Sequence, residues 1–283
     1  MKDLTIVRTV ADLRREVAAF RTAGRTIGLV PTMGALHEGH ISLVRGALGH
    51  SDVPVTSIFV NPTQFGPNED FGAYPRDEAG DLAKLEEAGC RLVFAPGKDE
   101  MYPDPQLTTV HVSEITEGLC SPLRPGHFDG VATVVTKLLM MAMPERGYFG
   151  EKDYQQLQVI RRMVRDLAMP IEIVGMPTVR EPDGLAMSSR NRYLGTAERA
   201  TARALHRQLS AVAETVRDGQ SSCTAAASAA AKALLSAGFD VVEYLTVVDA
   251  ESLHPLERVT GPARVVAATR LGRTRLIDNI AVD

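Results

Sequence analysis

The stretch from Ile27 to His40 reads IGLVPTMGALHEGH, an apolar run followed by a turn with Pro and Gly and then by a helical segment. Ile27–Val30 has the composition of a buried strand, and residues 36–48 carry the apolar spacing of a helix. A strand that turns directly into a helix is the first half of a βαβ unit, whose strands are parallel. The stretch therefore predicts an open α/β fold, with this turn at the carboxyl edge of the sheet.

The alternation of strand and helix continues on both sides of this stretch. The expected helices cover residues 3–23, 36–48, 77–88, 131–143 and 153–167. The expected strands cover residues 27–30, 53–60, 91–95, 147–149 and 171–179. Strands that alternate with helices favour a Rossmann-like, doubly wound, mostly parallel sheet with helices on both faces.

The pattern changes after about residue 185, where helices are followed by consecutive strands. Two Ala-rich helices are expected over residues 196–217 and 223–237, because alanine is the best helix former. Three strands are expected over residues 241–249, 263–268 and 275–282. This order indicates a separate α+β fold. We therefore divide the chain into a Rossmann-like domain, residues 1–185, and a smaller α+β domain, residues 186–283.

The composition is that of an ordinary globular protein. The 283 residues are 45% hydrophobic and 23% charged, with a formal net charge of −4, so we expect neither a nucleic acid nor an anionic membrane as partner. No apolar run approaches the roughly 20 residues that span a bilayer. The amino-terminal stretch is too polar for a secretory signal, which predicts a cytoplasmic protein. Three cysteines without C-x-x-C spacing favour neither a disulfide framework nor a structural zinc site.

Two histidines stand three positions apart at the expected helix start after residue 34. Helix N-termini present unbonded N–H groups and the positive end of the helix dipole, and both suit a phosphate. At this spacing His37 and His40 share one face of the helix, so both can reach one phosphate group. An ordinary helix start with two solvated histidines is the alternative. It explains a single histidine better than it explains an HxGH pair directly after strand-Pro-Thr-x-Gly.

Three other segments carry polar side chains that suit a small acid and a polyphosphate. Asn61 and Gln64 lie in a Pro/Gly-rich loop after the second long strand, where an amide can bind a hydroxyl or a carboxylate. Lys152 lies near a helix start, a position that the helix dipole disfavours by about 0.3–1 kcal/mol and that a phosphate would favour, whereas Asp153 can simply cap that helix. Residues 183–191 combine glycine, two serines and Arg190, which is typical of a polyphosphate clamp but also of a polar hinge.

Covalent catalysis has no recognisable motif in this chain. There is no G-x-S-x-G elbow, no G-x-x-x-x-G-K-[ST] loop and no carboxylate pair at glycosidase spacing. We therefore expect catalysis by placement and charge stabilisation. The turn from Arg124 to His127 is a further candidate, and either a functional role or an ordinary turn before a helix fits it.

Four segments together resemble one family of ligases. The HxGH element with a later Met-Ser-Ser-Arg resembles the nucleotidyltransferase superfamily, whose members attack the α-phosphorus of ATP or CTP. More narrowly, the chain resembles the pantoate–β-alanine ligase family, the pantothenate synthetases. The four segments that carry this resemblance, in order between residues 26 and 195, are PTMGALHEGH, IFVNPTQFGPNED, YFGEKDYQQLQVIRRM and GLAMSSRNRYL.

The resemblance implies an ATP-dependent, AMP-forming ligase that condenses pantoate with β-alanine to give pantothenate. The route would pass through pantoyl-adenylate, with release first of pyrophosphate and then of AMP. ATP would enter as a substrate with Mg²⁺, no organic cofactor would be tightly bound, and the protein would be a homodimer. The first domain would bind nucleotide and pantoate, and the second would act as a lid.

The resemblance also implies roles for individual residues, with His40 as the proton donor. The expected catalytic residues are His37, His40, Lys152 and Arg190. The expected ATP-binding residues are Met33, Gly34, His37, Gly39, His40, Gly150, Lys152, Asp153, Val179, Met187, Ser188, Ser189 and Arg190. The residues expected to contact pantoate or β-alanine are Met33, Asn61, Gln64 and Gln156. No protein ligand to a metal is expected, since Mg²⁺ would be held by the phosphates of ATP and by water.

Three other functions fit parts of the pattern. A relative of aminoacyl-tRNA synthetases would normally add a basic tRNA-binding region, and a cytidylyltransferase is usually a smaller single domain. A regulatory protein that binds nucleotide without catalysis would not need His37, His40, Lys152 and Arg190 together. The discriminating observation is whether pyrophosphate release depends on pantoate, on CTP substrates or on neither.

Overall fold

The computed structural model describes residues 4–50, 52–67 and 69–282. The chain divides into two compact units, which are described separately below. Unit 1 comprises Met1–Glu117, Ser121–Glu151 and Gln156–Pro177, and unit 2 comprises Gly118–Cys120, Lys152–Gln155 and Thr178–Asp283. Residues 178–185, which the sequence-based division assigned to the first domain, thus lie in unit 2. None of the described helices has the length and the apolar composition needed to cross a bilayer.

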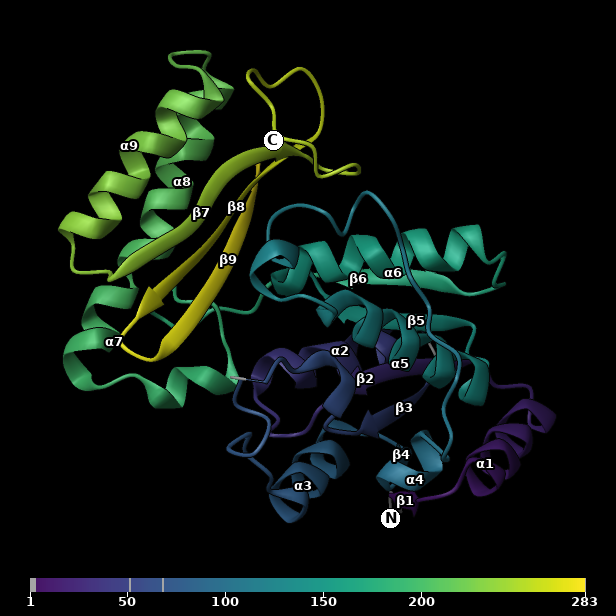
Figure 1. Ribbon diagram of the computed structural model, residues 1–283. Helices are drawn as coiled ribbons and strands as arrows, with labels where there is room; N and C mark the ends of the chain where they lie inside the picture. The colour runs from purple at the N-terminus through teal and green to yellow at the C-terminus, as the bar shows by residue number, and fades with distance from the viewer. Residues whose placement is uncertain (1–3, 51, 68, 283) are drawn as a thin grey trace. The chain divides into compact units, whose positions relative to one another are not determined.

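Unit 1 contains a six-stranded parallel sheet with the order β1-β4-β3-β2-β5-β6 (Figure 1). Its strands are β1 (Thr5–Val7), β2 (Ile27–Thr32), β3 (Val53–Ile58), β4 (Leu92–Phe94), β5 (Arg146–Gly150) and β6 (Glu172–Met176). From β2 the chain adds β3 and β4 on one side, and later β5 and β6 on the other side. The direction of winding therefore reverses between β2 and β5, and the doubly wound parallel sheet is confirmed.

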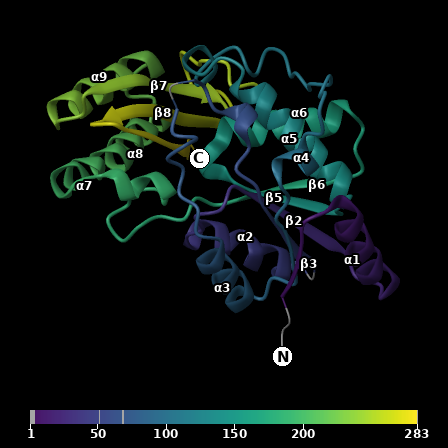
Figure 2. The same cartoon turned by 60° about the horizontal axis from the view of Figure 1, so that its bottom comes forward.

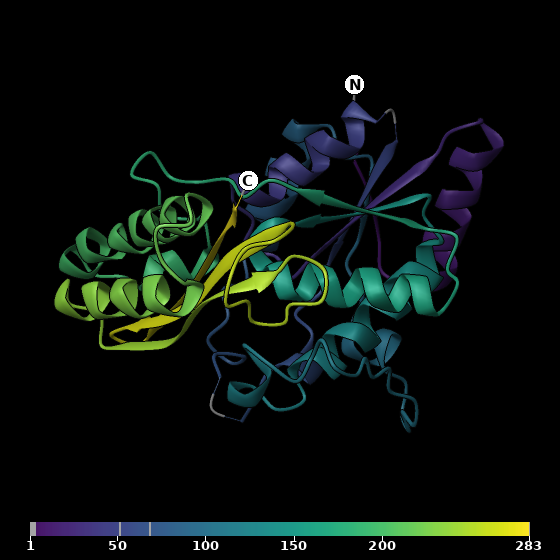
Figure 3. The same ribbon diagram turned by 90° about the horizontal axis from the view of Figure 1, so that it is seen from above.

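Helices lie on both faces of this sheet, as Figure 3 shows. They are α1 (Val10–Thr22), α2 (Glu38–Gly49), α3 (Glu78–Ala88), α4 (Lys98–Met101), α5 (His127–Ala142) and α6 (Tyr154–Asp166). The pair α2 and α3 lies side by side on one face (Figure 2), and α1 packs against α5. Leu43, Val44 and Ala47 of α2 are buried in a cluster with Val30 and Val93 of the sheet, which explains the apolar spacing of this helix.

The prediction of a helix over residues 3–23 is wrong at its amino-terminal end. Thr5–Val7 forms strand β1 and pairs with β4, and α1 begins only at Val10. Thr9 starts that helix, because its hydroxyl accepts a hydrogen bond from the N–H of Asp12 at 3.1 Å. Three β-branched residues favour a strand, but so short a run shows no periodicity that separates it from the helix behind it. Asp3, where the helix was expected to begin, lies outside the described residues.

Unit 2 contains an antiparallel sheet with the order β7-β8-β9. Its strands are β7 (Val241–Asp249), β8 (Ala263–Leu271) and β9 (Thr274–Val282), and its helices are α7 (Thr196–Ala202), α8 (Ala204–Arg217) and α9 (Cys223–Ser236). The helices α8 and α9 pack together beside the sheet (Figures 1 and 3), over a core that includes Leu205, Leu209 and Val265. The smaller α+β unit is therefore confirmed, although the helix expected over residues 196–217 is interrupted at Arg203.

A buried carboxylate fixes the amino edge of the parallel sheet. Asp52, directly before β3, is fully buried and accepts hydrogen bonds from the hydroxyls of Thr26 at 2.5 Å and Tyr148 at 2.7 Å. The guanidinium of Arg146 donates a third at 3.0 Å. Burial raises the pKa of Asp52, but these donors outweigh it and the pKa lies below its usual value. The side chain thus connects the segments that begin β2, β3 and β5.

We predict that Asp52→Ala lowers the free energy of unfolding by about 3–5 kcal/mol, because removing one partner leaves buried groups unpaired. Since the pKa of Asp52 is lower in the folded chain, its contribution is complete well above the unfolded value of about 3.9 and is lost as the pH falls through the folded pKa. Urea unfolding at a series of pH values measures both effects. Asp166→Asn, which removes an exposed pair with Arg162, is the control and should cost less than about 1 kcal/mol. Equal effects of the two substitutions at pH 7 would contradict this role.

Candidate active site

The turn after β2 is held by a carboxylate from α3. Gly34 and Ala35 have left-handed backbones with φ of +79° and +52°. The N–H groups of Ala35 and Leu36 donate to the two carboxylate oxygens of Asp81 at 2.8 and 2.7 Å, and Lys84 Nζ donates to Leu36 O at 2.8 Å. Asp81 is only 1% exposed, and burial raises its pKa despite the two N–H donors. Side chains of α3 therefore fix the backbone of the turn that connects β2 to α2.

The two histidines of the HxGH element form a capping box at the start of α2. His37 Nδ1 accepts a hydrogen bond from Gly39 N at 3.2 Å, and His40 Nδ1 accepts one from His37 N at 3.3 Å. A ring nitrogen that accepts a hydrogen bond carries no proton, so each neutral ring carries its proton on Nε2. The ring centroids are 4.1 Å apart. Two Nε2–H donors are thus held side by side at a helix N-terminus, a combination suited to a phosphate.

The loop after β3 brings the expected acid-binding residues together. Asn61, which is almost fully buried, donates from its amide to Gln64 Oε1 at 3.0 Å and to Gly130 O at 3.2 Å. The Asn61 carbonyl accepts a hydrogen bond from the Tyr102 hydroxyl at 2.7 Å, and the Gln64 amide lies 3.3 Å from Met33 Sδ. Met33, Asn61 and Gln64 therefore form one contiguous group in unit 1. Asn68, at the end of this loop, lies outside the described residues.

An ion pair supports the backbone of Gln64. Arg124 donates to both carboxylate oxygens of Glu69 at 2.6 Å, and its NH1 lies 2.9 Å from His127 Nε2. Because a guanidinium can only donate, His127 accepts at Nε2 and donates from Nδ1 to Gln64 O at 2.8 Å. Burial raises the pKa of Glu69, but the bonds and charge of Arg124 outweigh it and the net shift is downward. Arg124 and His127, whose role the sequence left open, thus hold Gln64 in place.

The expected residues of the β5–α6 junction are divided between the units. Gly150, the last residue of β5, and the half-buried Gln156 in the first turn of α6 belong to unit 1. Lys152 and Asp153 belong to unit 2, and their charged groups are 3.6 Å apart. The carbonyl of Lys152 accepts a hydrogen bond from Asn279 Nδ2 at 2.9 Å.

The remaining expected residues lie on a short hairpin of unit 2. Met187 N donates to Val179 O at 3.0 Å, and Arg180 forms an isolated bridge with Ala186. The hairpin leads into a 3₁₀ turn at Ser189–Tyr193, whose first N–H groups are capped by Ser188: its hydroxyl accepts from Arg190 N at 3.3 Å. Val179 and Met187 are therefore neighbours, and Ser188, Ser189 and Arg190 follow at the end of the hairpin.

The structure thus forms two groups from the expected site residues. In unit 1 they are Met33, Gly34, His37, Gly39, His40, Asn61, Gln64, Gly150 and Gln156. In unit 2 they are Lys152, Asp153, Val179, Met187, Ser188, Ser189 and Arg190. Asp81, Tyr102 and Glu69 support the first group and were not expected, because in sequence they resemble ordinary surface or core positions. Within the described residues, no three His, Cys, Asp or Glu side chains are arranged to hold a metal ion.

The chain is similar to known proteins over nearly its whole length. A family model described as pantoate-beta-alanine ligase matches residues 5–281. The pantothenate synthetase of Paramagnetospirillum magneticum is 57% identical over 281 residues, which are 98% of each chain. The crystal structure of pantothenate synthetase from Thermus thermophilus has a TM-score of 0.91 and 48% identity, over 99% of each chain. The pantoate-beta-alanine ligase of Francisella tularensis, complexed with beta-gamma ATP and beta-alanine, has a TM-score of 0.80 and 33% identity, over 98% of this chain and 97% of that one.

We predict that His37 and His40 carry their protons on Nε2 in the neutral protein, whereas His127 carries its proton on Nδ1. Long-range ¹H–¹⁵N correlation spectra of histidine-labelled protein near pH 8, above the usual imidazole pKa of about 6.5, distinguish these tautomers. Substitution of each histidine in turn assigns the signals. A proton on Nδ1 of His37 or His40 would contradict the capping box, and the opposite state of His127 serves as the internal reference.

Proposed function

The chain belongs to the pantoate-β-alanine ligase family, and on this basis we propose that it makes pantothenate from pantoate and β-alanine through a pantoyl-adenylate intermediate. Family membership makes the chain an ATP-dependent ligase. The proposed route has two steps. The carboxylate of pantoate attacks the α-phosphorus of ATP and pyrophosphate leaves; the amine of β-alanine then attacks the acyl carbon and AMP leaves. The observation that supports this route best is the capping box of His37 and His40 at the carboxyl edge of the sheet.

In the first step, His37 and His40 are proposed to bind the triphosphate. Negative charge moves toward the departing pyrophosphate as the new P–O bond forms. Two Nε2–H donors fixed by their own capping bonds are already oriented for that charge and need no reorganisation as the bond breaks. One such donor typically lowers the barrier by about 2.7–4 kcal/mol. His40 is the proposed proton donor.

The residues of unit 2 are proposed to hold the nucleotide. Lys152, Ser188, Ser189 and Arg190 would bind the phosphates, since an ammonium, two hydroxyls and a guanidinium together match the several oxygens of a polyphosphate. Further nucleotide contacts are proposed at the backbones of Gly150 and Val179, and at Met33, Gly34, Gly39, Asp153 and Met187. Magnesium is proposed to enter with ATP, and phosphate oxygens and water would be its ligands.

The group around Asn61 is proposed to bind the acid. Gln64 and Gln156 would bond the hydroxyl and carboxylate oxygens of pantoate, and Gln64 and Asn61 would also contact β-alanine. Met33, against the Gln64 amide, would line the apolar side of this site. A site built to bond a hydroxyl rejects an analogue without it by a factor of about 10⁴–10⁵, because the amide that the bound acid covers is then left unpaired. This part of the site is therefore the proposed source of selectivity for the acid.

Family membership argues against a tRNA synthetase or a cytidylyltransferase. A regulatory protein that binds nucleotide without turnover is the remaining alternative. Only a measurement of turnover distinguishes it from an enzyme. A homodimer, on the basis of the family resemblance, and a cytoplasmic location, on the basis of the composition, are also proposed. Analytical ultracentrifugation at micromolar protein concentration decides the first of these, with a mass near twice 30.6 kDa expected for the dimer.

Pyrophosphate release tests the proposed adenylation directly. The purified protein is mixed with Mg-ATP, with and without pantoate, and each mixture is tested both with β-alanine withheld and with β-alanine added. We expect a burst of pyrophosphate that requires pantoate and does not require β-alanine. Release that requires both acids would contradict a separate adenylation step. A folded protein that releases none under any of these conditions would leave only nucleotide binding without catalysis.

We predict that His40→Ala and Lys152→Ala each lower turnover at least about a hundredfold without loss of the fold, as expected when a charge-stabilising donor is removed. Steady-state rates and thermal melting are measured in parallel. The matched controls are His111→Ala, an exposed histidine of unit 1, and Lys232→Ala, an exposed lysine of α9, and both should keep normal rates. Near-normal turnover of His40→Ala or Lys152→Ala would remove that residue from the proposed mechanism.

A further inference from the structure

Two consecutive residues of β9, Asp278 and Asn279, contact both segments of unit 2 that are proposed to hold the phosphates of ATP. The two side chains are buried, and they come from the carboxyl-terminal strand of the antiparallel sheet. Neither is among the residues proposed to touch a substrate. Their contacts point in two directions, one toward the hairpin before Ser188 and the other toward Lys152.

Asp278 holds the hairpin through Arg180. The guanidinium of Arg180 donates to both carboxylate oxygens of Asp278, at 2.7 and 2.9 Å, and the Asp278 side chain is only 1% exposed. The same guanidinium donates to Gly184 O at 3.0 Å, at the tip of the hairpin, and to Asn279 O at 3.3 Å. A planar donor with four such bonds cannot rotate without breaking several of them. The position of the hairpin, and of Ser188 directly after it, is therefore fixed by β9.

Asn279 holds the main chain at Lys152. Its Nδ2 donates to Lys152 O at 2.9 Å, and its Oδ1 accepts from Arg264 NH1 at 2.6 Å. The two bonds require opposite ends of the amide, so they also define its orientation. Asn279 thus links the backbone of the proposed phosphate-binding lysine to β8.

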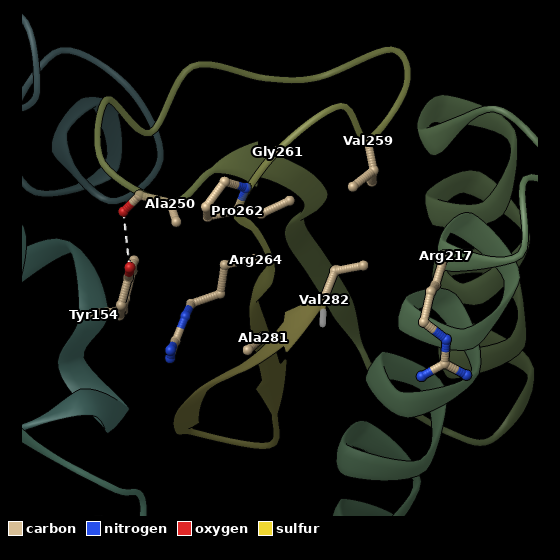
Figure 4. A pocket seen from close by; sticks show the side chains of 10 residues that line it. Tyr154, Arg217, Ala250, Val259, Gly261, Pro262, Arg264, Ala281 and Val282 are labelled. Carbon is tan, nitrogen blue, oxygen red and sulfur yellow. Dashed lines mark hydrogen bonds between the residues drawn. The ribbon is translucent and has the colours of Figure 1, made fainter.

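Arg264 on β8 and Ala250, directly after β7, contact Tyr154 at the start of α6. The guanidinium carbon of Arg264 lies 3.8 Å from the centre of the Tyr154 ring, and the Tyr154 hydroxyl donates to Ala250 O at 2.8 Å. Figure 4 shows Tyr154, Arg264 and Ala250 on the wall of a pocket of about 570 Å³. Tyr154 follows Lys152 by two residues, so the segment is held at the Lys152 carbonyl and at the Tyr154 side chain.

We propose that Asp278 and Asn279 are positioning residues for adenylation. Asp278, through Arg180, fixes the position of the segment Ser188–Arg190. Asn279 fixes the position of the main chain at Lys152. This inference rests on the proposed role of those segments in binding ATP. Two segments far apart in sequence must present their donors to one triphosphate with a fixed separation. Two adjacent, buried side chains of one strand supply that separation, and a misplacement of about 1 Å can cost a hundredfold in rate.

The informative substitution at Asn279 is Asn279→Asp, which keeps an acceptor for Arg264 but removes the donor to Lys152 O. At Asp278 it is Asp278→Asn, which keeps the shape but removes one acceptor and the charge. We expect each to lower the rate of pantoate-dependent pyrophosphate release at least about tenfold, with an unchanged KM for pantoate, whose proposed ligands lie in unit 1. Arg270→Gln on β8, which removes an exposed guanidinium that pairs with Glu243, is the control and should leave both constants unchanged, because Arg275 still pairs with Glu243.

A double-mutant cycle separates positioning from a general loss of structure. If Asn279 acts through Lys152, Asn279→Asp should change the residual rate of Lys152→Ala less than about twofold. Asp278→Asn should likewise have little effect in Arg190→Ala. Thermal melting verifies that each variant is folded, and Asn279→Ser, which also lacks the amide donor, replaces Asn279→Asp if that variant does not fold.

The outcomes are distinct. If Lys152→Ala is strongly impaired and Asn279→Asp lowers its residual rate by the same factor as it lowers the rate of the unmodified enzyme, the positioning role is overturned and the proposed function is left intact. A normal rate for Lys152→Ala overturns the proposed role of that lysine, and the positioning role of Asn279 with it. Normal rates for both Asn279→Asp and Asp278→Asn show that β9 does not position the site.

Discussion

The parallel pairing of β2 with β5 is the constraint on which the rest of unit 1 depends. Because the winding of the sheet reverses between these two strands, the connections from their carboxyl ends diverge, and the edge between them is left uncovered by a crossover. The chain leaves β2 through a left-handed turn and enters α2 at the HxGH element, where the two histidine side chains cap the start of the helix. Topology, capping chemistry and the helix dipole thus favour an anion at the same place. The ligase activity proposed here uses a position that the fold had already made suitable for a phosphate.

Within each unit, buried carboxylates hold the segments that carry the proposed site residues. Asp52 connects the strand starts at the amino edge, Asp81 holds the turn before His37, and Asp278 holds the hairpin before Ser188 through Arg180. A buried charge is tolerated only where several donors satisfy it, so each of these carboxylates has a geometry that its neighbours determine together. None of the three is proposed to touch a substrate. A catalyst that works by placing donors, without a covalent nucleophile, depends on such supports as much as on the donors themselves.

Features that leave a pattern within a short stretch of sequence were predicted correctly. Apolar runs and helical spacing located the long strands and helices, and the four family segments led to the ligase family. Thr5–Val7 was assigned to a helix, because three β-branched residues are too few to show a period. The supports of the site were missed for another reason: Asp81 and Ala35 are 46 positions apart, and Arg180 and Asp278 are 98 apart. An acidic residue in a charged helix or in the middle of a strand shows no sign in the sequence of the distant partner that it will meet in the fold.

The central claim is that the carboxylate of pantoate becomes bonded to the α-phosphorus of ATP. Transfer of ¹⁸O tests this claim most directly, because the oxygen that joins carbon to phosphorus in an adenylate leaves with the nucleotide. Pantoate labelled with ¹⁸O in its carboxylate is turned over with Mg-ATP and β-alanine, and the products are examined by ³¹P NMR and mass spectrometry. The account predicts one ¹⁸O atom in each AMP released and none in the pyrophosphate. Unlabelled AMP, or ¹⁸O in inorganic phosphate together with ADP, would contradict it.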